Sequence, residues 1–288
     1  MKGKYIKGEP SHNIDDNIDF QAKYHPPEKF NNFSKVEEYI VHLMHLKAYK
    51  NIIPNITGMK VLEIGCNNGW GTRFLSDYAS SIKGIDVSSS MIELAQKSYE
   101  KDNIEFNVTN GIRHNYDSKS FNVVVSFQVL EHVYDYSIYL SEISRLLDDG
   151  GYCFFTTPNA MMRLKQGMTP WNKYHVKEFN SLELDELLSQ YYSKVEIVGL
   201  FGDSKTYPIE FNRISNNREY ALRQNSLYYR FKGKIGNLLK KLYQNKSNIN
   251  KIKIELSQNV MDEFSTENFY FSKDNLDNCF DFFAFCKK

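Results

Sequence analysis

A carboxylate inside an apolar stretch stands just before two glycines. Glu63 interrupts the apolar run that starts at Lys60, and Gly65 and Gly69 follow it. Because a buried carboxylate is costly without a hydrogen-bond donor, Glu63 is expected to accept from backbone amides or from an amine of a ligand. Glycines permit positive φ and a close approach of the backbone to a ligand. The pattern predicts a strand, a ligand-binding turn and a helix whose first N–H groups face that ligand.

A second carboxylate, Asp86, ends the next apolar run, about twenty residues further along the chain. A carboxylate at the end of the second strand of an open α/β sheet can accept hydrogen bonds from both hydroxyls of a ribose, although it could instead cap the following helix. The Gly-x-Gly-x-x-Gly fingerprint of dinucleotide folds is absent, because Asn67 stands between the two glycines. Together the two carboxylates favour a ligand that contains a ribose.

The stretches around these residues alternate between strand and helix patterns, which predicts an open, doubly wound α/β fold with a mostly parallel, seven-stranded sheet. Strands are predicted at 60–64, 82–87, 104–108, 121–127, 152–157, 195–200 and 281–286. Helices are predicted at 70–78, 89–99, 136–147 and 181–192. Gly150 and Gly151 are expected to end the third of these helices. An earlier helix over 33–53 is expected to start at Ser34 as its N-cap and to end at Pro54.

The chain is expected to divide into an N-terminal arm and helix (1–54), a core (55–201 with 279–288) and an insertion before the last strand (202–278). The insertion is basic: positions 203–254 hold twelve Lys or Arg against three Asp or Glu. A helical pattern is expected there around 231–243. This segment could meet phosphates of a substrate, lie on an anionic membrane surface, or form a solvated basic face.

The composition is that of a globular protein: 288 residues, 41% hydrophobic and 25% charged. The first ten residues are polar, which argues against a signal peptide, and no apolar run reaches the roughly 20 residues of a membrane span. The four cysteines form no Cys-x-x-Cys pair, which predicts free thiols without a disulfide or a zinc site. We therefore expect a cytoplasmic protein.

In combination, four segments resemble the class I S-adenosylmethionine-dependent methyltransferases. They are Val61–Gly69, Gly84–Met91, Ser126–Val133 and Leu146–Asn159. The resemblance extends over about residues 35–201, with the final strand at the end of the chain. It implies a Rossmann-like fold, an enzyme that transfers methyl groups, and S-adenosylmethionine as its cofactor.

The resemblance also implies which residues bind that cofactor. Glu63 would lie at the methionine end, Asp86 at the ribose, and Val87 at the adenine. The family often has an Asp beside the adenine where this chain has Asn110, and Asn67 replaces the family's middle glycine. The complete expected set is Glu63, Gly65, Cys66, Asn67, Gly69, Asp86, Val87, Met91, Asn110, Gly111 and Phe127.

Three further segments resemble methyltransferases associated with bacterial surface polysaccharide and glycan biosynthesis. They are Thr157–Asn159, Asn172–Phe179 and Phe282–Lys287. This resemblance implies as acceptor a sugar hydroxyl on a nucleotide- or lipid-linked glycan intermediate, which could carry phosphate.

Other functions stay open at this point. A quinone-like or lipid acceptor is one alternative, and a non-catalytic scaffold that binds S-adenosylmethionine is another. Nucleic acid is not expected as a partner, because the fifth strand ends Thr-Thr-Pro-Asn instead of the Asn/Asp-Pro-Pro-Tyr expected for an adenine nitrogen. Basic charge alone keeps RNA as a further possibility. The oligomeric state is not predicted.

Two histidines are candidates for a general base, from which transfer to a hydroxyl acceptor would benefit. His132 follows the fourth strand, and His175 lies in an aromatic loop after the fifth. An imidazole titrates near neutral pH, which suits a general base, but either ring could instead be a packing residue or a hydrogen-bonding residue at a helix start. Trp171, Tyr174 and Met168, in the same loop, could stack on a sugar or pack a lid.

Metal binding is considered at two places, and no metal is predicted. Gln128, Glu131 and His132 could be part of a divalent-cation site, although Mg²⁺ usually takes more than one carboxylate. His42 and His45 are three residues apart on the first helix, but no other ligand cluster supports a zinc site there.

Overall fold

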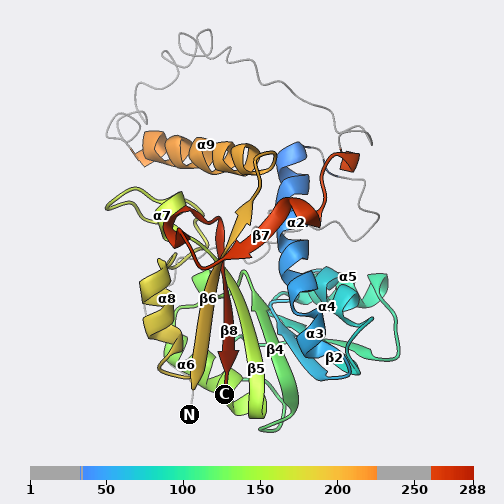
Figure 1. Ribbon diagram of the computed structural model, residues 1–288. Helices are drawn as coiled ribbons and strands as arrows, with labels where there is room; N and C mark the ends of the chain where they lie inside the picture. The colour runs from blue at the N-terminus through green and yellow to red at the C-terminus, as the bar shows by residue number, and fades with distance from the viewer. Residues whose placement is uncertain (1–32, 34, 226–260) are drawn as a thin grey trace, which may run out of the picture.

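The computed structural model describes residue 33 and residues 35–225 and 261–288, and a central eight-stranded sheet organises them (Figure 1). In spatial order the strands are β3 (Ile104–Val108), β2 (Ser81–Asp86), β1 (Lys60–Ile64), β4 (Phe121–Phe127), β5 (Leu147–Pro158), β8 (Asp281–Lys287), β6 (Lys194–Gly202) and β7 (Phe269–Ser272). Neighbouring strands from β3 to β5 are parallel, β8 is antiparallel to β5 and β6, and β7 is antiparallel to β6. The predicted Rossmann-like, mostly parallel sheet is confirmed. The predicted number of seven strands is wrong, because β7 adds an eighth at the edge.

Helices cover both faces of the sheet, which is why its inner strands are apolar on both sides. On one face α6 (Tyr136–Leu146) and α8 (Ser181–Leu188) pack against the sheet. On the other face lie α3 (Ile53–Ile56), α4 (Trp70–Leu75) and α5 (Ser89–Ser98). Val123, Val124 and Val125 of β4 are fully buried between the two layers.

A third group of elements lies beyond the carboxyl edge of the sheet. It consists of α2 (Val36–Asn51), α7 (Ala160–Arg163), α9 (Tyr207–Asn225) and the 3₁₀ turns η1 (Leu130–His132), η2 (Thr266–Asn268) and η3 (Leu276–Asn278). Figure 1 shows α2 rising from the sheet and α9 crossing above it. A small apolar cluster holds them together, in which Ile40 of α2, Met162 of α7 and Ile214 of α9 are buried with Phe269 of β7.

Several predicted boundaries were wrong. The N-cap of α2 is Lys35, without a side-chain hydrogen bond, whereas Ser34 lies outside the described residues. This helix ends at Asn51, and Pro54 stands in the first turn of α3, where a missing N–H is tolerated. The helical pattern expected at 231–243 also lies outside the described residues, while the long helix α9 was not predicted.

Gly150 and Gly151 do not end a helix, because α6 stops at Leu146 and both glycines lie inside β5. Gly150 has φ +74°. A Cβ on Gly151 would come within 2.8 Å of the carbonyl oxygen of Asn122, so a glycine allows β5 to approach β4 at this point.

None of the helices in the described ranges is both long and apolar enough to cross a membrane. The four cysteines are buried free thiols, and Cys153 of β5 lies opposite Cys286 of β8 in the strand register. The cytoplasmic location stays a prediction.

The packing of α8 on the sheet can be tested with two leucines of the same helix. Leu184 is fully buried, whereas Leu182 is 65% exposed. We expect Leu184→Ala to lower the free energy of unfolding by about 2–5 kcal/mol, since it leaves a cavity, and Leu182→Ala to change it by less than about 0.5 kcal/mol. Urea unfolding followed by circular dichroism measures both. Equal losses in the two variants would contradict this packing.

Candidate active site

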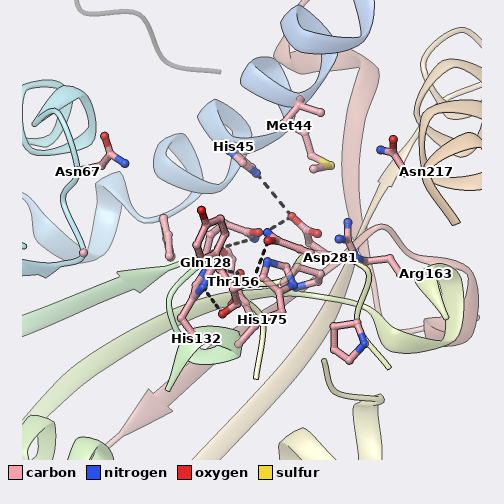
Figure 2. Close-up of a pocket in the computed structure, with 18 of the residues that line it drawn as sticks. Met44, His45, Asn67, Gln128, His132, Thr156, Arg163, His175, Asn217 and Asp281 are labelled. Atoms are coloured by element: carbon pink, nitrogen blue, oxygen red, sulfur yellow. Dashed lines mark hydrogen bonds and ion pairs between the residues drawn. The ribbon is translucent and has the colours of Figure 1, made fainter. Parts of the chain in front are cut away.

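A cavity of about 830 Å³ lies at the carboxyl edge of the sheet, where open α/β folds bind ligands. Its walls come from the loop after β1, the ends of β4 and β5, the start of β8, the loop after α7, and helices α2 and α9. Figure 2 shows Asn67 on one side of this space and Arg163 and Asn217 on the other, with His132 and His175 below. The predicted cofactor turn and both candidate bases therefore meet in one cavity.

The turn after β1 has the backbone that its sequence predicts. Gly65 and Gly69 have φ +76° and +79°. The N–H of Gly65 donates to Ile85 of β2 at 2.8 Å, and a Cβ on Gly65 would lie 2.4 Å from the Val129 side chain. Asn67 replaces a glycine at φ 49°, a left-handed conformation that Asn tolerates better than most residues. The loop therefore keeps a tight shape without its middle glycine.

Glu63 is 1% exposed and binds two hydroxyl groups. Tyr49 of α2 donates to Glu63 Oε1 at 2.5 Å, and Thr72 of α4 donates to Oε2. Burial raises the pKa of Glu63 to about 7, although both hydrogen bonds oppose that shift. The expected backbone amides are not among these partners. Glu63 instead ties α2 and α4 to β1, directly behind the cofactor turn.

Asp86 stands at the end of β2 and holds the turn in place. Its Oδ2 accepts from the N–H of Asn67 and its Oδ1 from the N–H of Ser88, both at 2.9 Å. Burial raises the pKa of Asp86, and these backbone bonds work against that rise. Ser88, and not Asp86, is the N-cap of α5. A carboxylate in this position can still accept from ribose hydroxyls, because each oxygen has two lone pairs.

An apolar surface beside Asp86 suits the adenine of the expected cofactor. Val87 is 47% exposed and Ile112 is 55% exposed. Gly111 has φ +71°, and a Cβ there would approach Val87 to 3.0 Å, so a larger residue would crowd this surface. Asn110 Oδ1 accepts from the amides of Ile112 and Arg113, which leaves its NH₂ group as the part that could meet a purine.

Four of the eleven predicted cofactor residues line the cavity, whereas Glu63, Asp86, Val87, Asn110 and Gly111 are not among its lining residues. Gly65, Cys66, Asn67 and Phe127 line the cavity itself. Met91 is buried at the start of α5, and Gly69 packs against Ala95 and Phe106, so these two shape the site from behind.

The two candidate bases are neighbours. The rings of His132 and His175 have centroids 4.8 Å apart and are nearly perpendicular. His132 Nδ1 lies 3.0 Å from the carbonyl oxygen of Tyr174, and His175 Nδ1 lies 2.7 Å from Glu178 Oε1. A carbonyl and a carboxylate accept hydrogen bonds, so Nδ1 of each ring carries the proton and Nε2 is the basic nitrogen.

A buried ion pair positions His175. Glu178 is 4% exposed, and Arg163 Nε donates to both of its oxygens at 3.0 Å. The Arg163 guanidinium lies over the Trp171 ring, 4.1 Å from its centroid. Burial lowers the pKa of His175, and Glu178 acts in the opposite direction. Burial lowers the pKa of His132 to about 3, so His132 is the weaker base.

The donor atoms of Glu131, His132 and His175 lie within 4.8 Å of one another and are the one metal-like cluster among the described residues. A tetrahedral zinc site with bonds of about 2.1 Å would hold its ligand atoms about 3.4 Å apart. The His132–Glu131 separation is 3.9 Å, and burial raises the pKa of Glu131 to about 8, which favours its neutral form. The cluster is thus wider than a metal site and has one carboxyl group, and the absence of a metal stays a prediction.

The other residues that were considered as metal ligands contact other groups of the protein. Gln128 donates to Asp281, and Glu131 accepts from Thr157. His42 is buried beside Trp70, with ring centroids 5.0 Å apart, while His45 faces Asp281 at 3.9 Å.

Sequence reasoning missed several residues that line the cavity or contact its lining. Arg163 and Glu178 act through His175, and Arg213 and Asn217 arrive on the unpredicted helix α9. Asp281 could have been predicted from the sequence, because it is a carboxylate at the start of an apolar strand. Glu63 was identified from the same kind of pattern.

Comparison with known proteins places the chain in a family. The family model described as "Methyltransferase domain" matches residues 14–201, and the chain belongs to that family. A Mycolicibacterium smegmatis protein named "Probable S-adenosylmethionine-dependent methyltransferase" is 32% identical over 158 residues, which are 54% of this chain and 61% of that protein. A ubiquinone biosynthesis O-methyltransferase of Pelagibacter ubique is 28% identical over 149 residues, 50% of this chain and 60% of that protein. The chain thus spans about 60% of the length of these relatives.

Among solved structures, the YcgJ protein of Bacillus subtilis superposes with a TM-score of 0.51 at 14% identity, over 85% of this chain and 99% of that one. This similarity supports the Rossmann-like fold alone. The family and the fold imply S-adenosylmethionine as the cofactor.

The cofactor position can be tested at Asp86. We expect Asp86→Ala to weaken the binding of S-adenosylmethionine and S-adenosylhomocysteine by about 10- to 100-fold, because hydrogen bonds to a charged group are lost. Asp102→Ala, at an exposed turn, is the matched control and should bind normally. Isothermal titration calorimetry of the folded variants measures the affinities. An unchanged affinity in Asp86→Ala would place the ribose elsewhere.

Buried carboxyl groups also predict how stability depends on pH. The pKa of Glu131 is raised to about 8, above its ordinary value, so the fold favours the protonated form. This stabilisation is complete below the ordinary pKa and is lost as the pH rises through about 8, so the free energy of unfolding should fall between pH 5 and pH 8. Glu131→Gln should flatten this slope, whereas the exposed Glu93→Gln should not. Thermal unfolding across this range measures it, and equal slopes in all three proteins would contradict the burial of an ionisable Glu131.

Proposed function

We propose that this protein transfers the methyl group of S-adenosylmethionine to a hydroxyl of a sugar on a nucleotide- or lipid-linked glycan intermediate. One observation carries the proposal: His175, held by Glu178, lines the same cavity as the turn Gly65–Asn67 that would receive the cofactor. A base accelerates transfer to a hydroxyl acceptor, since the oxygen loses a proton on methylation.

When bound, S-adenosylmethionine supplies a methyl group on a sulfonium, and its transfer to oxygen breaks the S–C bond, leaves the electron pair on sulfur and releases the hydroxyl proton. In our proposal His175 Nε2 accepts that proton. Glu178 keeps the other ring nitrogen protonated and stabilises the imidazolium, while Arg163 fixes the carboxylate. The cavity walls supply proximity and orientation, which can lower a barrier by about 7–11 kcal/mol.

The polarity of the cavity supports a sugar. Gln128, Asn172, Asn217 and Asp281 line it and offer both donors and acceptors of hydrogen bonds. Trp171 also lines the cavity, and the guanidinium of Arg163 lies over its ring. Sugars present several hydroxyls around a small apolar face, and a cavity of this mixed character fits them.

A quinone-like acceptor is the second candidate. Val41, Met44 and Ala48 of α2 give one wall of the cavity an apolar surface, together with Phe127 of β4. The relatives named ubiquinone biosynthesis O-methyltransferases favour this candidate as well. A scaffold that binds the cofactor without turnover is the third candidate, and it would show binding but no transfer with any acceptor.

We also propose that the insertion before the last strand contacts the acceptor, because α9 brings Arg213 and Asn217 to the cavity. In the N-terminal half of α9, Arg213 forms an ion pair with Glu210. Further along the helix, Arg218 donates to the carbonyl oxygen of Met162. A phosphate-bearing acceptor, or peripheral contact with an anionic membrane, would use the basic positions further along this segment, which lie outside the described residues. A role in binding nucleic acid is not proposed.

The base can be tested with two variants and a control. We expect His175→Asn to lower kcat by about 10²- to 10⁴-fold with the affinity for S-adenosylmethionine unchanged. Glu178→Gln removes the charge that raises the pKa of His175, so kcat should fall and the acid limb of the pH–rate profile should move to lower pH. The exposed Glu186→Gln on α8 should behave as wild type.

Initial rates of transfer from radiolabelled S-adenosylmethionine, measured against a panel of nucleotide sugars and catechols, provide the readout. A wild-type pH profile in Glu178→Gln would exclude His175 as the base, and normal turnover in both His132→Asn and His175→Asn would exclude a histidine base altogether.

A further inference from the structure

Gln128 has an unusual backbone at the centre of the cavity. It follows β4 at φ 56°, a left-handed conformation that is uncommon for a residue other than glycine, asparagine or aspartate. Hydrogen bonds to Thr156 of β5 hold it there: its N–H donates to the carbonyl oxygen at 2.9 Å and to Oγ1 at 3.2 Å, and its Nε2 donates to Oγ1 at 3.2 Å. Such backbone strain persists where the surroundings enforce it, often at binding sites.

The second amide hydrogen of Gln128 is used as well. Nε2 donates to Asp281 Oδ2 at 2.9 Å. An ionised Asp281 can only accept hydrogen bonds, so the amide nitrogen of Gln128 faces it, and the amide oxygen Oε1 is the group that Gln128 can offer to a ligand.

Asp281 is placed by the sheet itself. It is the first residue of β8 and lies in register between Pro158 of β5 and Leu200 of β6. It is 5% exposed and lines the cavity, and Figure 2 shows it beside Gln128 and Thr156. His45 Nε2 is 3.9 Å from Oδ2, too far for a hydrogen bond. No described residue donates to its other oxygen, Oδ1.

With Asp281 ionised, Gln128 and Asp281 offer acceptors and no donors to whatever occupies this part of the cavity. Among the described residues, the guanidiniums near Asp281 are committed to other carboxylates, Arg163 to Glu178 and Arg213 to Glu210. A buried carboxylate with one hydrogen bond is under-satisfied, so a ligand that supplies a donor gains free energy by binding there.

We propose that Asp281, oriented by Gln128, binds a second hydroxyl of the acceptor next to the hydroxyl that is methylated, so that the substrate class is a vicinal diol. This inference rests on the proposed function, because it assumes that the reacting hydroxyl lies at His175 in the same cavity. The neighbouring hydroxyl donates to Asp281 Oδ1, and the amide oxygen of Gln128 can accept from the same ligand. A sugar and a catechol share this chemistry, and the experiment separates them.

The experiment compares acceptors that differ by one hydroxyl. The full-length protein is given S-adenosylmethionine with methyl α-D-glucopyranoside, methyl α-D-mannopyranoside or catechol, each against the analogue that lacks one of the two neighbouring hydroxyls. We expect wild type to favour a diol over its deoxy analogue by about 10- to 100-fold in kcat/KM, the range for one hydrogen bond to a charged group. The pair that turns over identifies the acceptor as sugar or aromatic.

Variants assign this preference to residues. Asp281→Ala should bring the ratio close to one, and the isosteric Asp281→Asn should lower it by a smaller factor, because a neutral hydrogen bond replaces a charge-assisted one. Gln128→Asn, which tolerates the left-handed backbone but shortens the side chain, should also lower the ratio. Asp185→Ala, exposed on α8, is the control. The affinity for S-adenosylhomocysteine should stay unchanged in all four, which confirms that each variant is folded.

The possible results separate the two claims. Turnover with the diol preference intact in Asp281→Ala and Gln128→Asn would overturn the diol site and leave the proposed function standing. Equal use of diol and deoxy acceptors by wild type would overturn it as well. Turnover of no hydroxylated acceptor, with cofactor binding intact, would overturn both.

Discussion

Carboxyl groups buried at the carboxyl edge of the sheet are the constraint on which this structure depends. Parallel strands bring their ends to one edge, and here Glu63, Asp86 and Glu131 stand on or just after three of them, while Asp281 enters the same edge on an antiparallel strand. Each is costly to bury, and each is satisfied in a different way, by hydroxyls for Glu63 and by backbone amides for Asp86. Glu131 and Asp281 each accept from one side chain, Thr157 and Gln128, and Asp281 lines the cavity.

The helices outside the core contact this edge of the sheet. Helix α2 reaches the cofactor turn through the Tyr49–Glu63 hydrogen bond and the acceptor side through His45 and Met44. Helix α9 closes the opposite side, and the two helices pack together through Ile40 and Ile214. These two helices therefore form two walls of the cavity at the ligand-binding edge of the fold.

The sequence predicted the core well, because its signals are local. Strand β4 with its three valines, strand β1 and the glycine turn were placed correctly from apolar runs and residue types. The edge strand β7 and helix α9 were missed, since β7 has four residues and α9 lacks a clear apolar stripe. Pairs such as Arg163 with Glu178 and Gln128 with Asp281 could not be predicted from the sequence, because the two residues are 15 and 153 positions apart. Only the folded chain brings them together. His132 and His175 were each identified alone, and only the fold brings their rings together.

A crystal structure of the full chain with S-adenosylhomocysteine tests the central claim most directly. The account predicts the ribose hydroxyls at Asp86, the adenine against Val87 and Ile112, and the sulfur facing the cavity that His175 lines. A ligand bound at another place, or a sulfur that points away from this cavity, would contradict methyl transfer at this site.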